Sequence, residues 1–215
     1  LTYLVLETDE GLEGIGEARI LSKTHTVIEF LKDASRHFIG HSPHDIEALY
    51  RRMTLFDFGK PGEVVFTGLA LVELACWDII GKAASQPVYN LLGGCVRKTV
   101  PAYANGWYTV ERSPEDFALA AQRVMSRGYR GLKFDPFGMG DLELSRTEFH
   151  KSMDLIEAVA SVTSGRAQIM LEMHGRFSPH QAREIAHHVE QFNPAWIEEP
   201  TRPGDIASMR SVRQH

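Results

Sequence analysis

The stretch IMLEMHGRF, residues 169–177, carries a carboxylate, Glu172, within a run of apolar side chains and closes on His174, Gly175 and Arg176. A short apolar run bounded by Gly is typical of a strand that is covered on both faces. An unpaired carboxylate in such a strand costs several kcal/mol or takes up a proton. We therefore expect the end of this strand to provide a partner for Glu172.

A strand followed by a helix recurs on both sides of this stretch. Strands are predicted over residues 99–105, 130–135, 167–173 and 194–200, with helices over 113–128, 144–162, 178–191 and from 205. Repeated units of this kind with apolar strands indicate a parallel sheet. Four units do not close an eight-stranded barrel, so we expect either an open sheet or a fragment of a barrel.

Residues 1–97 follow a different pattern. Two alternating segments flank a break at residues 9–11, which predicts a hairpin, because Gly11 supplies the positive φ of a tight turn. Helices are predicted over residues 26–38, 42–53 and 66–84. This first part therefore reads as an α+β domain.

Composition excludes several classes of protein. The chain has 215 residues, of which 43% are hydrophobic and 24% charged, and this balance is typical of a globular protein. A net charge of -5 without a basic cluster argues against a nucleic-acid surface. We expect no membrane helix, because no apolar run approaches the ~20 residues that such a helix requires. Two lone cysteines, Cys76 and Cys95, favour a reducing compartment, and we expect the cytoplasm.

Polar side chains stand at the end of every predicted strand. In strand order they are Asn105 and Trp107, then Lys133 and Asp135, then Glu172 and His174, and last Glu198 and Glu199. The carboxyl ends of parallel strands meet at one edge of a sheet. Two carboxylates there either share a proton or hold a hard divalent cation such as Mg²⁺. Side chains two residues apart share a face, so His174 is expected beside Glu172, and Asp135 beside Lys133.

Four segments together resemble the enolase superfamily, in its mandelate racemase/muconate lactonizing enzyme branch. They are GLALVELACWDIIGKAASQPVYNLLGG (68–94), YRGLKFD (129–135), LEMHGRF (171–177) and WIEEP (196–200). The resemblance implies an α+β capping domain followed by a TIM-like (β/α)7β barrel. Residues 1–97 would be the cap, without its first strand and its C-terminal part. Residues 98–215 would be the first half of the barrel, with about four βα units, in a chain truncated at its C-terminus.

The same resemblance implies a Mg²⁺ site. Members of the family hold Mg²⁺ with carboxylates at the ends of three consecutive strands, and Glu172 and Glu198 match the first two ligands. The first ligand is usually Asp, one methylene shorter than Glu172. The third ligand would lie on the next strand, beyond this chain.

Lys133 matches the first Lys of the Lys-x-Lys pair of the racemases, but Asp135 stands where the base Lys would be. His174, two residues after the first ligand and followed by Gly-Arg, matches the galactonate- and gluconate-type sugar-acid dehydratases. His174 is then the general acid, with Lys133 and Asp135 as further catalytic residues. The enzyme would be a hydro-lyase, a carbon–oxygen lyase. A base on a later strand would remove the proton α to the carboxylate, through a metal-stabilised enediolate, and the product is a 2-keto-3-deoxy acid.

Two alternatives stay open. One is a racemase, epimerase or cycloisomerase of the same superfamily, and the other is a non-catalytic relic or assembly subunit. In either enzyme the partner is a small carboxylate substrate, and the family implies a homo-oligomer, a dimer or an octamer.

The resemblance also suggests which residues bind substrate. Cap loops at about residues 19–26 and 55–64 would set specificity, through Arg19, Lys23 and His25 in the first loop and Phe56, Phe58 and Lys60 in the second. At the strand ends we expect Asn105, Trp107 and Arg176 to bind substrate.

Overall fold

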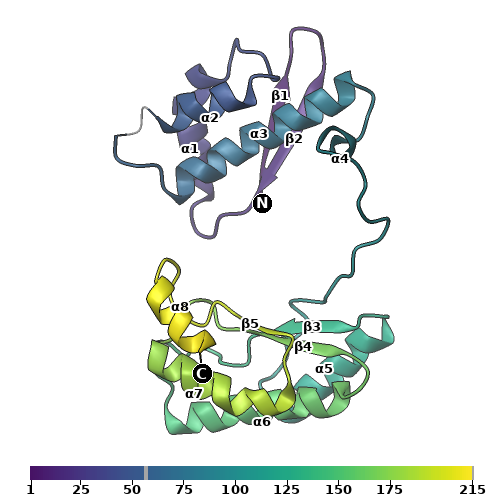
Figure 1. The fold of residues 1–215 in the computed structure, drawn as a ribbon, viewed down its shortest axis with the longest axis vertical. Coiled ribbons are helices and arrows are strands. Elements are labelled where there is room, and N and C mark those ends of the chain that lie inside the picture. Colours follow the sequence, from purple (N-terminus) through teal and green to yellow (C-terminus); the bar gives the residue numbers. More distant parts are fainter. Residues whose placement is uncertain (56–57, 215) are drawn as a thin grey trace. The chain divides into compact units, whose positions relative to one another are not determined.

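The computed structural model describes residues 1–55 and 58–214 and divides the chain into two compact units, Leu1–Lys98 and Thr99–His215. Figure 1 draws the helices and strands of both units. Each unit has a hydrophobic core of its own. The two units are therefore described separately.

The first unit is an antiparallel hairpin packed on helices. Its elements are β1 (Thr2–Glu7), β2 (Glu13–Ala18), α1 (Thr24–Ala34), a 3-10 turn (Ser35–His37), α2 (Ile46–Thr54), α3 (Glu63–Ala83) and α4 (Val88–Leu91). Strands β1 and β2 pair with Val5 opposite Ile15, which confirms the predicted hairpin. Helix α2 begins at Ile46, so the start predicted at residue 42 is wrong. The amide of Asp45 bonds the carbonyl of Ser42 at 3.1 Å, and these residues form a turn before the helix.

Helix α3 lies directly against the backbone of β2. A Cβ atom on Gly16 would lie 2.0 Å from the carbonyl oxygen of Leu71, and one on Gly14 would lie 2.1 Å from that of Ala75. Both glycines face α3, because side chains two residues apart share one face of a strand. The glycines of β2 therefore permit a contact that no other residue type allows.

We expect Gly16→Ala to destabilise the protein by about 1–3 kcal/mol, because the added methyl group forces strand and helix apart. The measurement is the free energy of unfolding in urea. Gly62→Ala is the control, since a Cβ there meets no atom within 4 Å. Equal losses in the two variants would contradict the close packing of β2 on α3.

Helix α3 corrects the expectation about apolar runs. It has 21 residues and contains an 18-residue window with a mean hydropathy of 1.8, so it is long and apolar enough to cross a membrane. This is weak evidence for a membrane span, because the core helix of a globular unit meets the same criteria. Leu71, Val72 and Ala75 of α3 are fully buried in the first unit.

Asp78 of α3 ties the helix to the hairpin. Its Oδ2 atom accepts hydrogen bonds from the amide of Ile15 at 3.0 Å and from Lys82 Nζ at 2.8 Å. The bond from Lys82 is the largest cause that lowers the pKa of Asp78. Partial burial opposes it, and the Ile15 amide adds to it.

The lowered pKa predicts how Asp78 affects stability at different pH. A depressed folded-state pKa contributes stability above the unfolded value of about 3.9, and this is lost as the pH falls through the folded value. We expect Asp78→Asn to cost up to about 1 kcal/mol at pH 7, limited by solvent screening of this partly exposed carboxylate. Urea unfolding at pH 7 and at acid pH checks this. A cost that is the same at both pH values would contradict it.

The second unit is a parallel sheet with its strands in chain order. Its elements are α5 (Pro114–Ser126), β3 (Gly131–Phe134), α6 (Arg146–Thr163), β4 (Gln168–Glu172), α7 (Pro179–Val189), a 3-10 turn (Glu190–Phe192), β5 (Trp196–Glu198) and α8 (Ile206–Arg213). The sheet has the order β3-β4-β5, and both pairs are parallel. A parallel sheet without a reversal of strand order is what the start of a βα barrel requires.

The strand expected at residues 99–105 is not formed. Only Ala104 pairs with the sheet, through a parallel bridge to Leu132. Its amide bonds the carbonyl of Gly131 at 2.8 Å, and its carbonyl accepts from the amide of Lys133 at 2.9 Å. Pro101 has no N–H to extend this ladder. The predicted count of four units is therefore not confirmed among the described residues.

The two faces of the sheet differ in character. One face carries Leu132, Phe134 and Leu171, which are fully buried in the core formed with the helices. Helices α5, α6 and α7 lie on this side of the sheet (Figure 1). The opposite face carries Lys133 and the two glutamates that end β4 and β5, as the period of two requires. Lys133, Glu172 and Glu198 therefore share the face opposite α5, α6 and α7.

Candidate active site

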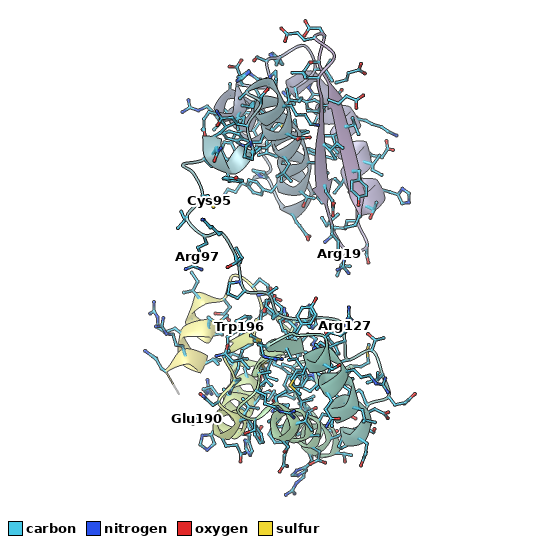
Figure 2. All side chains as sticks on the ribbon, turned by 90° about the vertical axis from the view of Figure 1, so that its right-hand side faces the viewer. Arg19, Cys95, Arg97, Arg127, Glu190 and Trp196 are labelled. Carbon is cyan, nitrogen blue, oxygen red and sulfur yellow. The ribbon has the colours of Figure 1, made fainter. Side chains whose placement is uncertain are left out.

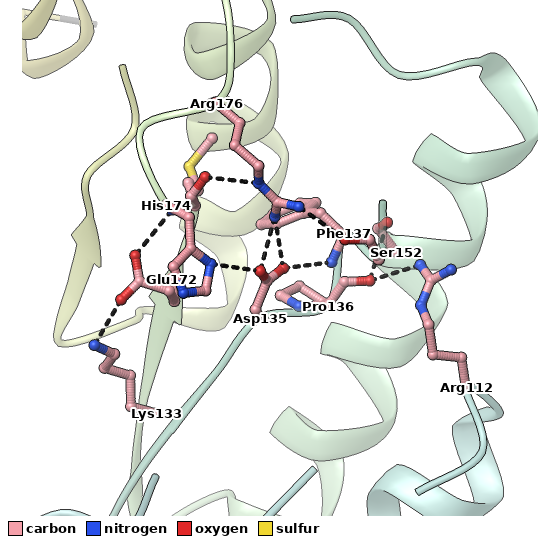
Figure 3. Close-up of polar contacts among 11 residues, drawn as sticks. Arg112, Lys133, Asp135, Pro136, Phe137, Ser152, Glu172, His174 and Arg176 are labelled. Atoms are coloured by element: carbon pink, nitrogen blue, oxygen red, sulfur yellow. Dashed lines mark hydrogen bonds and ion pairs between the residues drawn. The ribbon is translucent and has the colours of Figure 1, made fainter. Parts of the chain in front are cut away.

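Lys133 joins the two carboxylates at the strand ends. Glu172 and Glu198 are direct neighbours in the register of β4 and β5. The Nζ atom of Lys133 lies 2.6 Å from Glu172 Oε2 and 2.8 Å from Glu198 Oε1 (Figure 3 shows the pair with Glu172). The side chains of Lys133 and Glu172 are each only 7% exposed. Lys133 is thus the partner that the buried carboxylate required.

Lys133 and Glu198 stabilise the charged forms of each other's side chains. Burial disfavours the Lys133 ammonium, but its hydrogen bonds to Glu172 and Glu198 outweigh burial and raise the pKa of Lys133 above its usual value. The hydrogen bond from Lys133 to Glu198 lowers the pKa of Glu198. Partial burial acts to raise this pKa, and the hydrogen bond from the Trp196 indole lowers it further. Lys133 is therefore an ammonium, and Glu198 a carboxylate, at neutral pH.

The donor atoms fit a hard divalent cation. Two carboxylates from adjacent strands converge on a single positive charge, the Lys133 ammonium, and carboxylate oxygens are the ligands that Mg²⁺ prefers. Residues 1–55 and 58–214 contain no group of three or more His, Cys, Asp or Glu side chains placed to hold a metal. Glu172 and Glu198 would thus be two ligands of a set that needs further oxygens.

His174 and Asp135 form a second group beside the first. The Nδ1 atom of His174 lies 2.7 Å from Asp135 Oδ2, and Arg176 Nη2 bonds both oxygens of Asp135 at 3.0 and 2.8 Å (Figure 3). The main-chain amide of His174 donates to Glu172 Oε1 at 2.9 Å. This bond joins the two groups. Asp135 is thus paired with His174 and Arg176, while Lys133 is paired with Glu172 and Glu198.

Aromatic side chains that sequence reasoning did not single out border the carboxylates. The indole Nε1 of Trp196 donates to Glu198 Oε2 at 3.1 Å, and its ring meets Tyr103 edge-on with centroids 5.5 Å apart (Figure 2 labels Trp196). Lys133 Nζ lies 5.8 Å from the centroid of the Tyr103 ring. Trp196 was foreseeable, because it lies two residues before Glu198 on the same face. Tyr103 lies outside a regular strand and carries no such signal.

Tyr108 belongs to the same neighbourhood. Burial raises the pKa of Tyr108, and the negative charges of Asp135 and Glu172 raise it further. The tyrosine therefore stays a neutral phenol at physiological pH.

Two residues predicted to bind substrate follow the single bridge to β3, on the side of the sheet away from β5. Trp107 packs against Phe134 and Phe117 with centroids 5.4 and 6.2 Å apart, so most of its ring belongs to the core. Its buried Nε1 atom has no hydrogen-bond partner among the described residues. Asn105 is exposed, and its Oδ1 accepts from the amide of Gly106 at 2.8 Å.

Three further residues predicted to bind substrate belong to the first unit. Arg19 is exposed just after β2 (Figure 2), and His25 is exposed near the start of α1. Lys23 pairs with Glu63 at 2.6 Å, which links the two predicted cap loops. The roles of Arg19, Lys23 and His25 in binding substrate stay predictions.

The second predicted cap loop is described only in part. Phe56 lies outside the described residues. Phe58 is 96% exposed, and Lys60 has a left-handed backbone with a φ of 64°. The lining role of these side chains also stays a prediction.

Comparison with known proteins identifies relatives along most of the chain. The domain family "Mandelate racemase / muconate lactonizing enzyme, N-terminal domain" matches residues 1–93, and "Enolase C-terminal domain-like" matches residues 116–215. D-gluconate dehydratase of Thermoproteus tenax is 35% identical over 208 residues, which are 96% of this chain and 42% of that protein. D-gluconate/D-galactonate dehydratase of Picrophilus torridus is 35% identical over 199 residues, 92% of this chain and 51% of that protein. The chain spans about half the length of these curated relatives.

Solved structures agree with these relatives. A crystal structure described as that of a proposed dehydratase from Mesorhizobium loti superposes with a TM-score of 0.94 at 30% identity, and covers 99% of this chain and 58% of that one. A mandelate racemase/muconate lactonizing enzyme from Jannaschia sp. CCS1 superposes with a TM-score of 0.90 at 30% identity, with 99% and 59% covered. Strand order, strand-end carboxylates and both domain matches lead to the same conclusion. The chain belongs to the enolase superfamily, in its mandelate racemase/muconate lactonizing enzyme branch.

Proposed function

We propose that the protein to which this chain belongs is a Mg²⁺-dependent dehydratase of a sugar acid. The observation that carries the proposal is the convergence of Glu172 and Glu198 on the Lys133 ammonium, 2.6 and 2.8 Å from its Nζ atom, with the main-chain amide of His174 bonded to Glu172. The relatives named as gluconate and galactonate dehydratases support the choice of substrate class.

The residues of this chain have two roles: Glu172 and Glu198 would bind the cation, and His174 would transfer a proton. A divalent cation bound by Glu172 and Glu198 would stabilise the negative charge that develops on the substrate carboxylate when its α-proton leaves. His174 donates a proton to the β-hydroxyl, which departs as water when the C–O bond breaks. The remaining enol takes up a proton at carbon and becomes the 2-keto-3-deoxy acid. The base that removes the α-proton is not assigned to a residue of this chain.

The sequence at the end of β3 argues against the racemase alternative. The racemases that this chain resembles carry their base at the second position of a Lys-x-Lys pair, and that position here is Asp135. The Lys133 side chain, at the first position, pairs with Glu172 and Glu198. Lysine-based proton transfer at the α-carbon therefore has no support from these residues.

The test uses the full-length protein with Mg²⁺ and a panel of aldonic acids that includes gluconate and galactonate. We expect water loss and a 2-keto-3-deoxy product from at least one acid. Exchange of the α-proton for deuterium without water loss would instead indicate a racemase or epimerase. No turnover, together with no rise of the unfolding temperature on addition of Mg²⁺, would indicate a non-catalytic protein, since a bound cation stabilises the folded state.

A further inference from the structure

Asp135 and Lys133 lie two residues apart at the end of β3. The side chain of Asp135 nevertheless contacts His174 and not Lys133. Its Oδ2 atom lies 2.7 Å from His174 Nδ1, and the Asp135 side chain is only 12% exposed. We propose that Asp135 is a positioning residue that holds the His174 ring in one orientation, and that Arg176 holds Asp135. The inference rests on the proposed role of His174 as the general acid.

The pairing selects one tautomer of His174. An ionised carboxylate accepts hydrogen bonds but cannot donate one, so His174 Nδ1 must carry the proton that Asp135 accepts. The other ring nitrogen, Nε2, bonds to none of the described residues, and the side chain is 54% exposed. Nε2 is therefore the atom that exchanges a proton with substrate.

Three donors fix the carboxylate of Asp135. Arg176 Nη2 bonds both oxygens, at 3.0 and 2.8 Å, and the amide of Phe137 bonds Oδ1 at 2.9 Å (Figure 3). The third donor is His174 itself. A carboxylate held on both oxygens cannot rotate without losing several bonds at once, so the acceptor that faces the imidazole is fixed in place.

Arg176 is fully engaged within the protein. Besides Asp135, its Nη1 donates to the carbonyl of Gly138 at 2.7 Å and its Nε to that of Met173 at 3.2 Å. Its side chain is 22% exposed. The guanidinium is thus directed to the loop after β3 and to the end of β4. This arrangement fits support of Asp135 better than the substrate binding predicted for Arg176.

The backbone of His174 is constrained as well. Its φ of 50° lies in the left-handed region, which non-glycine residues adopt at a cost and which is frequent at functional sites. Its amide bonds Glu172, and the next amide, of Gly175, bonds the carbonyl of Glu199 at 2.8 Å. Main chain and side chain together hold the acid at a constant position relative to a cation ligand.

The experiment compares Asp135→Asn with wild type in the full-length protein, by three readouts. Steady-state kinetics with the sugar acid separate kcat from KM, α-proton exchange in D₂O reports the step before water loss, and ¹⁵N NMR of the imidazole reports the tautomer of His174. We expect kcat for water loss to fall about 10- to 100-fold, as misplacement of a reacting group does. KM, α-proton exchange and the Mg²⁺-induced rise in unfolding temperature should change less than about twofold, and the Nδ1–H signal should become a mixture of tautomers.

Two further variants keep the test decisive. Arg176→Lys retains the charge but not the two-pronged contact, and should lower kcat by a smaller factor in the same direction. Arg112→Lys is the matched control, because Arg112 bonds the neighbouring carbonyl of Pro136 at 2.7 Å and, among the described residues, makes no hydrogen bond to Asp135. Its kcat should be unchanged. If Asp135→Asn does not fold, Arg176→Lys takes its place.

The outcomes separate this inference from the proposed function. An unchanged kcat in Asp135→Asn, or equal losses of water elimination and α-proton exchange, would overturn the positioning role. A wild-type tautomer other than Nδ1–H would also overturn it, whatever the activity. Absence of water loss in the wild-type enzyme would instead refute the proposed function, while the NMR result still tests the contact between Asp135 and His174.

Discussion

His174→Gln is expected to reduce the rate of water loss by about 10²- to 10⁴-fold, the usual contribution of a general acid. Glutamine retains a polar side chain but cannot deliver a proton to the departing hydroxyl. The side chain of His174 is 54% exposed, and Glu172 bonds only its main-chain amide, so folding and cation binding should survive the change. The measurement is kcat of the full-length enzyme with its sugar acid at saturating Mg²⁺.

His180→Gln is the matched control for His174→Gln. His180 is exposed at the start of α7 and takes part in none of the strand-end contacts, so its replacement should leave kcat within twofold. If His174→Gln retained wild-type kcat, the acid would have to be another residue. A parallel loss of Mg²⁺-dependent stabilisation would show instead that His174 supports the fold of the site.

Glu172→Gln is expected to remove most of the stabilisation that Mg²⁺ gives to the folded protein. A ligand present at 100 times its Kd stabilises by about 2.7 kcal/mol, and a neutral amide is a much poorer ligand for a hard cation than a carboxylate. Glu172 is the more buried of the two candidate ligands, with a side-chain exposure of 7% against 36% for Glu198. The measurement is the rise in unfolding temperature with increasing Mg²⁺.

Glu199→Gln provides the comparison for Glu172→Gln. Glu199 directly follows Glu198, but it is exposed, and it is the main-chain carbonyl of Glu199 that accepts a hydrogen bond, from the amide of Gly175. We expect this variant to keep the full response to Mg²⁺. A full response in Glu172→Gln would show that the cation binds elsewhere, and the assignment of Glu172 and Glu198 as ligands would then fail.

Much of the fold follows from local patterns in the sequence. The alternation around Gly11 predicted the hairpin, and the short apolar runs predicted β3, β4 and β5. The rule that parallel strands end at one edge placed Glu172 beside Glu198, which are neighbours in the register. These features depend on backbone periodicity, and periodicity is visible in a single sequence.

The contacts within the site depend on information that periodicity does not carry. Asp135 and Lys133 share a strand face, yet Asp135 pairs with His174, 39 residues later, because the backbone of His174 turns into the left-handed region after β4. The engagement of Arg176 depends on the path of the loop through Gly138. Side-chain rotamers and loop paths are set by tertiary packing, so the pairing of acids and bases had to come from the structure.

The same limit applies at two places in the fold. The segment at residues 99–105 has the composition of a strand, but only Ala104 pairs with β3. The sequence predicts a long apolar helix at α3, but the close contact of α3 with Gly14 and Gly16 depends on how the hairpin packs. Both outcomes are decided by neighbours that are distant in sequence.

The most direct test of the central claim is a crystal structure of the full-length protein grown with Mn²⁺, examined by anomalous scattering. The account predicts a single strong peak within about 2.2 Å of a carboxylate oxygen of both Glu172 and Glu198. A peak elsewhere, or no peak at these strand ends with Lys133 still bridging the two carboxylates, would contradict it.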